Sequence, residues 1–143
     1  MIEYIKKNKI IFAQIIRSKF KSKKGVNFFT KPNLIQQVAY MNHKQGHKII
    51  PHYHKRTVRK INKTSEVLII LNGKLRVDFY SNNEKYLFSK IIKKNDIIIL
   101  NSGGHGFKVL ETVEMIEVKQ GPYNIKTDKK VFNSINDKFV KIK

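Results

Sequence analysis

The chain has 143 residues, a length that suits one domain with one hydrophobic core. It has no cysteine, which excludes disulfides and thiolate ligands, so a metal would need histidine and carboxylate ligands. Thirty basic residues against ten acidic ones give a net charge of +20. Such a surface attracts nucleic acid, anionic lipid or phosphorylated ligands. The lysines are scattered, however, and no nucleic-acid-binding motif accompanies them. An AT-rich genome favours lysine, and this is a sufficient explanation of the high net charge.

The N-terminal third is expected to contain short strands separated by basic loops. Residues 2–16 split at Asn8-Lys9 and favour a hairpin, because Asn tolerates the left-handed turn conformation. An amphipathic helix over the same residues is the alternative. A short apolar piece at residues 26–30 and a strand within residues 34–43 follow. The start of the chain is too charged for a secretory signal, and no apolar run approaches a membrane span, so we expect a cytoplasmic protein.

The centre of the chain predicts a strand, a long loop and a hairpin. Residues 48–54 alternate as a strand, and Pro51 within them indicates a sheet edge or a bulge. A polar and basic loop, residues 55–65, carries Arg56 and Arg59, which are candidate contacts for a substrate anion. Asn72-Gly73 lies between two β-rich runs and predicts a tight hairpin turn.

The C-terminal half predicts more strands and a basic tail. Its expected strands are residues 86–92, 96–100, 107–110 and 113–118, with the last two forming a hairpin at Glu111-Thr112. Gly121-Pro122 ends this pattern, and the tail is expected to lie across the barrel or to be partly disordered. At least seven short strands with regular turn signals indicate an all-β sandwich or barrel.

Four side chains form a candidate metal site. His52 and His54 share one face of the expected strand, because alternate side chains of a strand point the same way. Glu66 is the first residue on an otherwise apolar strand face, where a buried carboxylate needs a partner. Gly103-Gly104 allows a tight turn that delivers His105. Three imidazoles and one carboxylate suit Zn, Fe, Mn, Ni or Co. His43 and His47 are interpreted as rim residues outside this set.

In this part of the chain the sequence resembles the cupin superfamily. The order of the first cupin motif is followed by Gly46, His52, His54, Glu66 and Gly73. Five residues separate Gly46 from His52, and six separate Glu66 from Gly73. The segment NDIIILNSGGHGF resembles the second motif in its Gly and its His. The tail GPYNIKTDKKVF is similar to the ending of a subgroup of small bacterial cupins without a settled activity.

The resemblance implies a single jelly-roll barrel, the double-stranded β-helix, over residues 34–120. Residues 1–33 would be an N-terminal extension packing on the barrel, and residues 121–143 a C-terminal tail. It also implies one divalent transition metal at His52, His54, Glu66 and His105, and a homodimer through barrel edges is compatible with it.

Three functions are open to such a protein. The first is a metal-dependent enzyme acting on a polar or anionic small molecule, such as a sugar or sugar-nucleotide derivative, by isomerase-, epimerase- or oxygenase-like chemistry. The second is a metal- and ligand-binding module without turnover, and the third is a basic nucleic-acid-binding protein. Candidates for a catalytic acid or base are Tyr40, Arg76, Glu117 and Tyr123.

Overall fold

The regular structure of the chain is all β, as the turn and strand pattern predicts. The computed structural model describes residues 1–124 and 126–143, and these residues contain no α-helix. Its strands are β1 (Ile2–Lys7), β2 (Ile10–Ile16), β3 (Gly25–Phe28), β4 (Ala39–Asn42), β5 (Glu66–Tyr80), β6 (Tyr86–Lys93), β7 (Ile97–Leu100) and β8 (Gly104–Lys119). One 3₁₀ turn, Asp137–Phe139, lies near the C-terminus. No helix among the described residues is long and apolar enough to span a membrane.

The chain packs as two compact units. The main unit comprises Met1–Phe20 and Thr64–Lys143, and the insert unit comprises Lys21–Lys63. The boundaries expected at residues 33 and 120 stay a prediction. The two units are described separately below.

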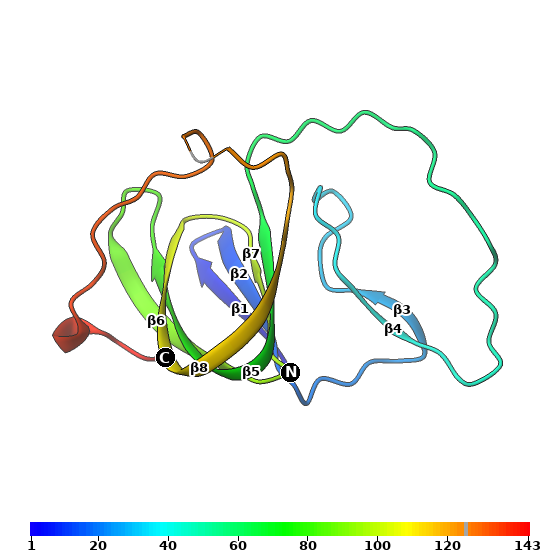
Figure 1. Cartoon of the computed structure of the whole chain (residues 1–143), viewed down its shortest axis with the longest axis horizontal. Helices are drawn as coiled ribbons and strands as arrows, with labels where there is room; N and C mark the ends of the chain where they lie inside the picture. Colours follow the sequence, from blue (N-terminus) through cyan, green and yellow to red (C-terminus); the bar gives the residue numbers. More distant parts are fainter. Residues whose placement is uncertain (125) are drawn as a thin grey trace. The chain divides into compact units, whose positions relative to one another are not determined.

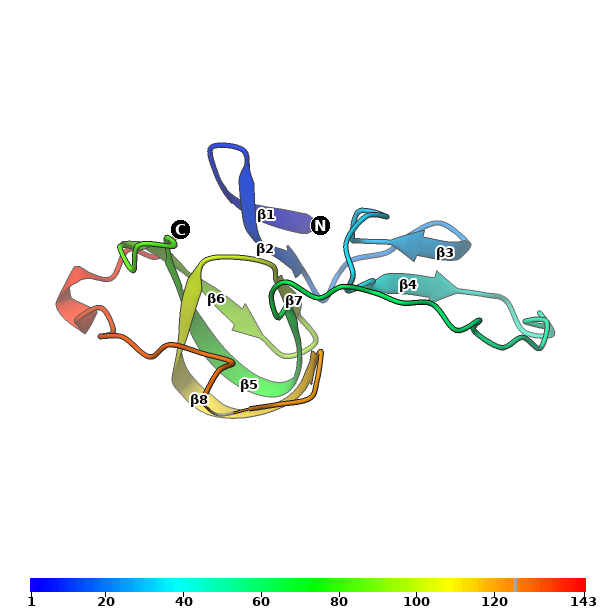
Figure 2. The same cartoon turned by 90° about the horizontal axis from the view of Figure 1, so that it is seen from above.

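The main unit is a curled antiparallel sheet that forms a half-barrel (Figures 1 and 2). β1 and β2 form the expected hairpin, and Asn8 has the positive φ of 55° that its turn requires. β2 pairs with β7, and β7 pairs with the first residues of β5. β6 and β8 also pair with β5, and β8 runs beside β5 around the curl.

The predicted hairpin at Asn72-Gly73 is wrong, because β5 continues through these residues. A two-residue type I′ turn needs positive φ at both residues, and here Gly73 alone has it, at 81°. The pairing of β5 with β8 instead shifts register three times between Ile70 and Leu75. The Asn-Gly pair therefore bends the strand as a bulge and does not reverse the chain.

The predicted hairpin at Glu111-Thr112 is wrong for the same reason. β8 is one strand whose two halves both pair with β5, and Glu111 lies opposite Lys74 at the bend. The two strands bend together at this point. A Cβ atom added to Gly73 would lie 1.9 Å from the carbonyl oxygen of Thr112, so the close approach requires glycine.

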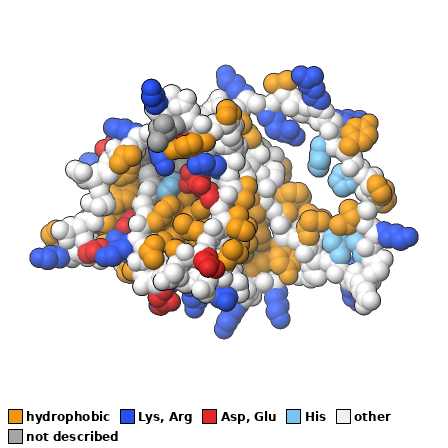
Figure 3. Space-filling view, in the orientation of Figure 1, with side chains coloured by type: hydrophobic (Ala, Val, Ile, Leu, Met, Phe, Trp, Pro, Cys, Tyr) orange, Lys and Arg blue, Asp and Glu red, His pale blue; other side chains and the backbone are white. Residues whose placement is uncertain are grey.

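The core lies on the inner side of the curl. Aliphatic and aromatic side chains from β1, β2, β5, β6 and β7 form one buried cluster: Ile5, Phe12, Ala13, Ile15, Leu68, Ile70, Leu75, Val77, Phe79, Ile92, Ile98 and Leu100. β8 contributes less to it, because Phe107, Val109 and Met115 are exposed. Figure 3 shows hydrophobic side chains gathered over β5 and β8, with Lys and Arg side chains around them.

The C-terminal segment packs against β5 and β6. This agrees with the first of the two expectations for the tail, that it lies across the barrel. Phe132 contacts the ring of Tyr80, and the Ile135 amide donates to the Tyr80 hydroxyl at 2.9 Å. Ile142 forms a parallel bridge with Ser89 of β6. Residue 125, within the same tail, lies outside the described residues.

The insert unit contains a two-stranded sheet and a long segment without regular structure. β3 and β4 pair antiparallel, so the strand expected within residues 34–43 is confirmed for Ala39–Asn42. The strand predicted at residues 48–54 is wrong, because this segment is exposed and has no strand partner. Pro51 lacks a donor for a ladder, and exposed Tyr53 and Val58 lack apolar cover.

Candidate functional site

Glu66 and His105 meet inside the curl of the main unit. Glu66 begins β5, beside Leu100 of β7 and Lys119 of β8. His105 lies at the start of β8 and pairs with Phe79, near the other end of β5. Because β5 bends between these positions, the Glu66 Oε2 atom lies 3.0 Å from His105 Nε2.

The sequence places both side chains on the core-facing side of the sheet. Glu66 alternates with the buried Leu68 and Ile70, and His105 stands opposite the buried Phe79. The turn before His105 is tied to β2, since the amides of Asn101 and Ser102 both donate to the carbonyl oxygen of Phe12. His105 is therefore positioned by backbone contacts.

The turn that delivers His105 requires glycine, as predicted. Gly103 has a φ of 75°, and a Cβ atom there would lie 2.3 Å from the Phe12 ring. The neighbouring Gly104 packs under the ring of Phe132. Both glycines thus permit close approach as well as the tight turn.

The hydrogen bond from His105 lowers the pKa of the Glu66 carboxyl below its ordinary 4.5, and this effect outweighs the opposing effect of burial. Lys119 and Lys129 lower the pKa further through their charge. Glu66 and His105 side chains are 21% and 28% exposed, so both can be reached from solvent.

Two lysines act on Glu66 through their charge, and both approach the ring of Tyr123. Lys119 lies 4.6 Å and Lys129 lies 5.9 Å from the centre of the Tyr123 ring. Glu117 lies 3.6 Å from Lys119 on β8. Two catalytic candidates, Tyr123 and Glu117, therefore interact with a lysine that acts on Glu66, and the surroundings favour anionic groups.

The other predicted ligands and anion contacts belong to the insert unit. His52 and His54 are exposed, with ring centres 5.4 Å apart, and the Nδ1 atom of His52 lies 2.9 Å from the carbonyl oxygen of Ile50. Arg56 and Arg59 are exposed in the same segment. Within residues 1–124 and 126–143, no three His, Asp or Glu side chains are grouped as a metal site. The four-ligand set stays a prediction.

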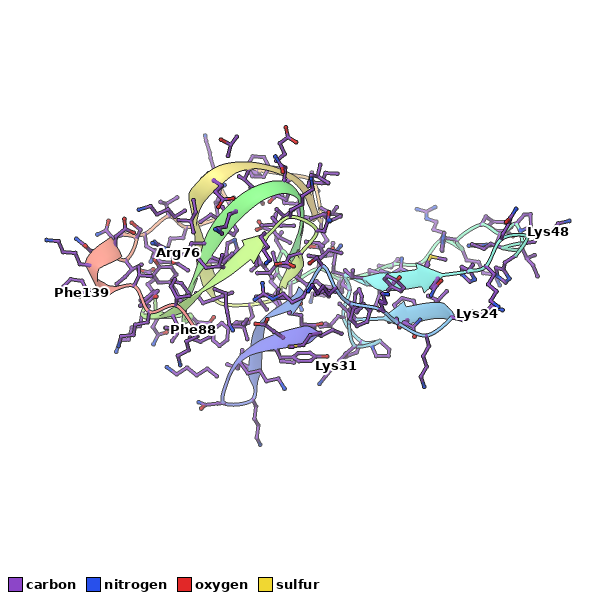
Figure 4. The ribbon with its side chains drawn as sticks, turned by 90° about the horizontal axis from the view of Figure 1, so that it is seen from below. Lys24, Lys31, Lys48, Arg76, Phe88 and Phe139 are labelled. Carbon is purple, nitrogen blue, oxygen red and sulfur yellow. The ribbon has the colours of Figure 1, made fainter. Side chains whose placement is uncertain are left out.

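Two further candidates lie in different surroundings. Arg76 is buried, and its guanidinium binds both carboxylate oxygens of Asp78 at 2.8 and 2.9 Å and Asp137 at 2.7 Å. These contacts raise its pKa, so the side chain is held as a cation. Figure 4 shows Arg76 on the side of the main unit that bears the C-terminal segment with Phe139. Tyr40 lies on β4 of the insert unit, half-buried.

Sequence reasoning missed two networks of charged side chains, each built on a buried carboxylate. One joins Arg76, Asp78 and Ser89, whose hydroxyl donates to Asp78 at 2.5 Å. The other joins Arg17 to Glu3 and to the fully buried Asp96. The spacing of Arg76 and Asp78, two residues apart on one strand face, was a signal for the first pair. No local signal marks the second network, because its members are far apart in the sequence.

Comparison with protein-family models, with curated proteins and with solved structures found no match to this chain. The pair of Glu66 and His105 is therefore interpreted by its own chemistry. Carboxylate oxygen and imidazole nitrogen are ligands that divalent transition metals accept, and together they also form a proton-transfer pair.

Proposed function

We propose that this chain is a metal-binding cupin-type protein that acts on a polar or anionic small molecule. The ligands that we propose in the main unit are Glu66 and His105, and His52 and His54 remain the further ligands that the sequence predicts. The observation that supports the proposal is the Glu66–His105 contact at 3.0 Å, made by two residues predicted as ligands from separate motifs. A metal bound there would polarise a carbonyl, activate water or bind dioxygen.

The chain's own residues supply binding and proton transfer in this proposal. Lys119 and Lys129 attract an anionic substrate to the surroundings of Glu66, and the Tyr123 ring that both lysines approach offers an apolar face. Glu66 is ionised at neutral pH, and its lowered pKa keeps the carboxylate charged at lower pH as well, so that it can bind a cation. This electrostatic arrangement favours small carboxylates or phosphate esters as substrates.

The proposal is tested by elemental mass spectrometry of protein purified without a His tag. We expect about one divalent metal per chain in the natural protein, because ligands of this type bind transition metals tightly. The double variant His52→Ala/His54→Ala and the single variant His105→Ala should both lose it.

The matched control is His43→Ala/His47→Ala, which removes another histidine pair of the insert unit. These two rings stack on each other with centres 4.2 Å apart. Because neither residue belongs to the proposed ligand set, their loss should leave the metal content unchanged. Metal that follows His43 and His47, or no metal after incubation with divalent ions, would refute the proposed site. A metal that stays bound without turnover of any substrate would favour the binding module over the enzyme.

A further inference from the structure

A cavity of about 450 Å³ lies in the main unit, where β2 ends beside β5 and β6. Arg17, Lys19, Lys74 and Lys93 line it, together with Ile91 and one carboxylate, Asp96. Its size is within the range of sites for small molecules. Glu66 and His105 are not among its lining residues.

Asp96 builds one wall of this cavity and holds Arg17 in place. Its side chain is fully buried, and its Oδ1 atom accepts the Ser18 amide at 2.8 Å. Its Oδ2 atom accepts Arg17 Nη1 at 2.9 Å and the Lys93 amide at 3.2 Å. The carboxylate oxygens of Asp96 thus already accept hydrogen bonds from groups of the protein itself. The pair of Asp96 with Arg17 fixes the guanidinium at the cavity.

The cavity has more cationic groups than there are carboxylates paired with them. Arg17 is paired with Glu3 and Asp96, and Lys74 is paired with Glu111. In the described part of the chain, no carboxylate lies within 4.0 Å of the Lys19 or Lys93 amino group, and no hydrogen bond involves Arg17 Nη2. Two ammonium groups and one guanidinium nitrogen are therefore left to bind an anion.

We propose that this cavity binds a small organic phosphate, with the phosphate on Lys19, Lys93 and Arg17 and an apolar group against Ile91. A guanidinium held in place, with two ammonium groups beside it on a concave surface, recognises phosphate by charge and by hydrogen bonds. Met1 and Ile91 give the cavity an apolar part, which suits a phosphate monoester better than inorganic phosphate alone. This site is independent of the proposed metal site.

The probe is phenyl phosphate, measured by isothermal titration calorimetry in the presence of EDTA, so that metal plays no part. We expect saturable binding to one site, weaker binding of inorganic phosphate, and no binding of phenol. Lys19→Gln and Lys93→Gln should each weaken phenyl phosphate binding by about fivefold to tenfold, which is the loss of one charged contact. Both lysines are exposed, so neither change should alter the unfolding temperature.

The matched control is Lys9→Gln, which removes the same charge at the opposite end of the β1–β2 hairpin. Its affinity should equal that of the natural protein. Amide chemical shifts of the natural protein should change at Ser18 and at Lys93 on titration. Absence of saturable binding would overturn the proposal, and so would an equal loss of affinity in the Lys9 variant or shift changes confined to other residues.

Discussion

At the scale of single residues, Arg76 and Asp78 show how charge is buried in this sheet. Their side chains are 9% and 5% exposed, and two parallel hydrogen bonds join them. Asp137 from the C-terminal segment binds the same guanidinium. A candidate for catalysis in the sequence thus has a structural role in the fold, because it connects β5 to the end of the chain.

Replacing Asp78 with Ala should lower the free energy of unfolding by about 3 kcal/mol, because it leaves a buried guanidinium with one partner fewer. Urea denaturation followed by circular dichroism measures this loss. The control is Glu111→Ala, which breaks an exposed pair with Lys74 and should cost under about 1 kcal/mol. Equal losses in the two variants would show that the buried pair contributes no more than a surface pair.

At the scale of elements, the bend shared by β5 and β8 determines where Glu66 and His105 lie. Gly73→Ala should cost about 3 kcal/mol or more, because the added methyl group meets the Thr112 backbone at a positive φ. Denaturation in urea measures this cost. Gly106→Ala on the same pair of strands is the control, with its nearest neighbour 3.8 Å away, and should change stability by under about 0.5 kcal/mol. A mild effect at Gly73 would mean that the bend relaxes easily.

The sequence predicts strand positions in this protein better than it predicts chain reversals. The N-terminal hairpin is confirmed, because Asn8 adopts the left-handed turn conformation. The two expected hairpins at Asn72-Gly73 and Glu111-Thr112 are bends, because each lies opposite the other in a long-range pairing. A local turn signal cannot distinguish a reversal from a bulge when the partner strand is distant in sequence.

The candidate site shows the same limit. Glu66 and His105 were predicted to lie together from their motifs, and the structure brings them to 3.0 Å. His52 and His54 were assigned to a strand, and that strand is absent from the described insert unit. Alternation of side chains predicts a shared face, but it cannot provide the partner that holds a strand in a sheet.

At the scale of the whole molecule, the network of Glu3, Arg17 and Asp96 ties the start of the chain to the β6–β7 turn. Arg17 donates to Glu3 at 2.5 Å, and this bond lowers the Glu3 pKa from its ordinary 4.5 to about 2. Lys90 contributes a second ion pair at 2.9 Å. The folded protein therefore binds fewer protons at Glu3 than the unfolded chain does between these two pH values.

The stability contributed by Glu3 should be complete above pH 4.5 and should fall as the pH drops toward 2. Unfolding temperatures measured across this interval should decline more steeply for the natural protein than for Glu3→Gln, which cannot titrate there. Other carboxylates titrate in both proteins, so the difference between the two curves isolates Glu3. Parallel curves would contradict the lowered pKa.

The pairing of β2 with β7 also has a consequence for how the protein folds. Ala13 of β2 pairs with Leu100 of β7, so the N-terminal hairpin can pair with β7 only after most of the chain has been synthesised. Sheets dominated by such distant pairings fold on the order of milliseconds to seconds, because a large loop must close before contacts compensate for its entropy. During that time the apolar strand Ile10–Ile16 keeps one edge open to other chains, which makes slow dilution at low protein concentration the suitable refolding condition.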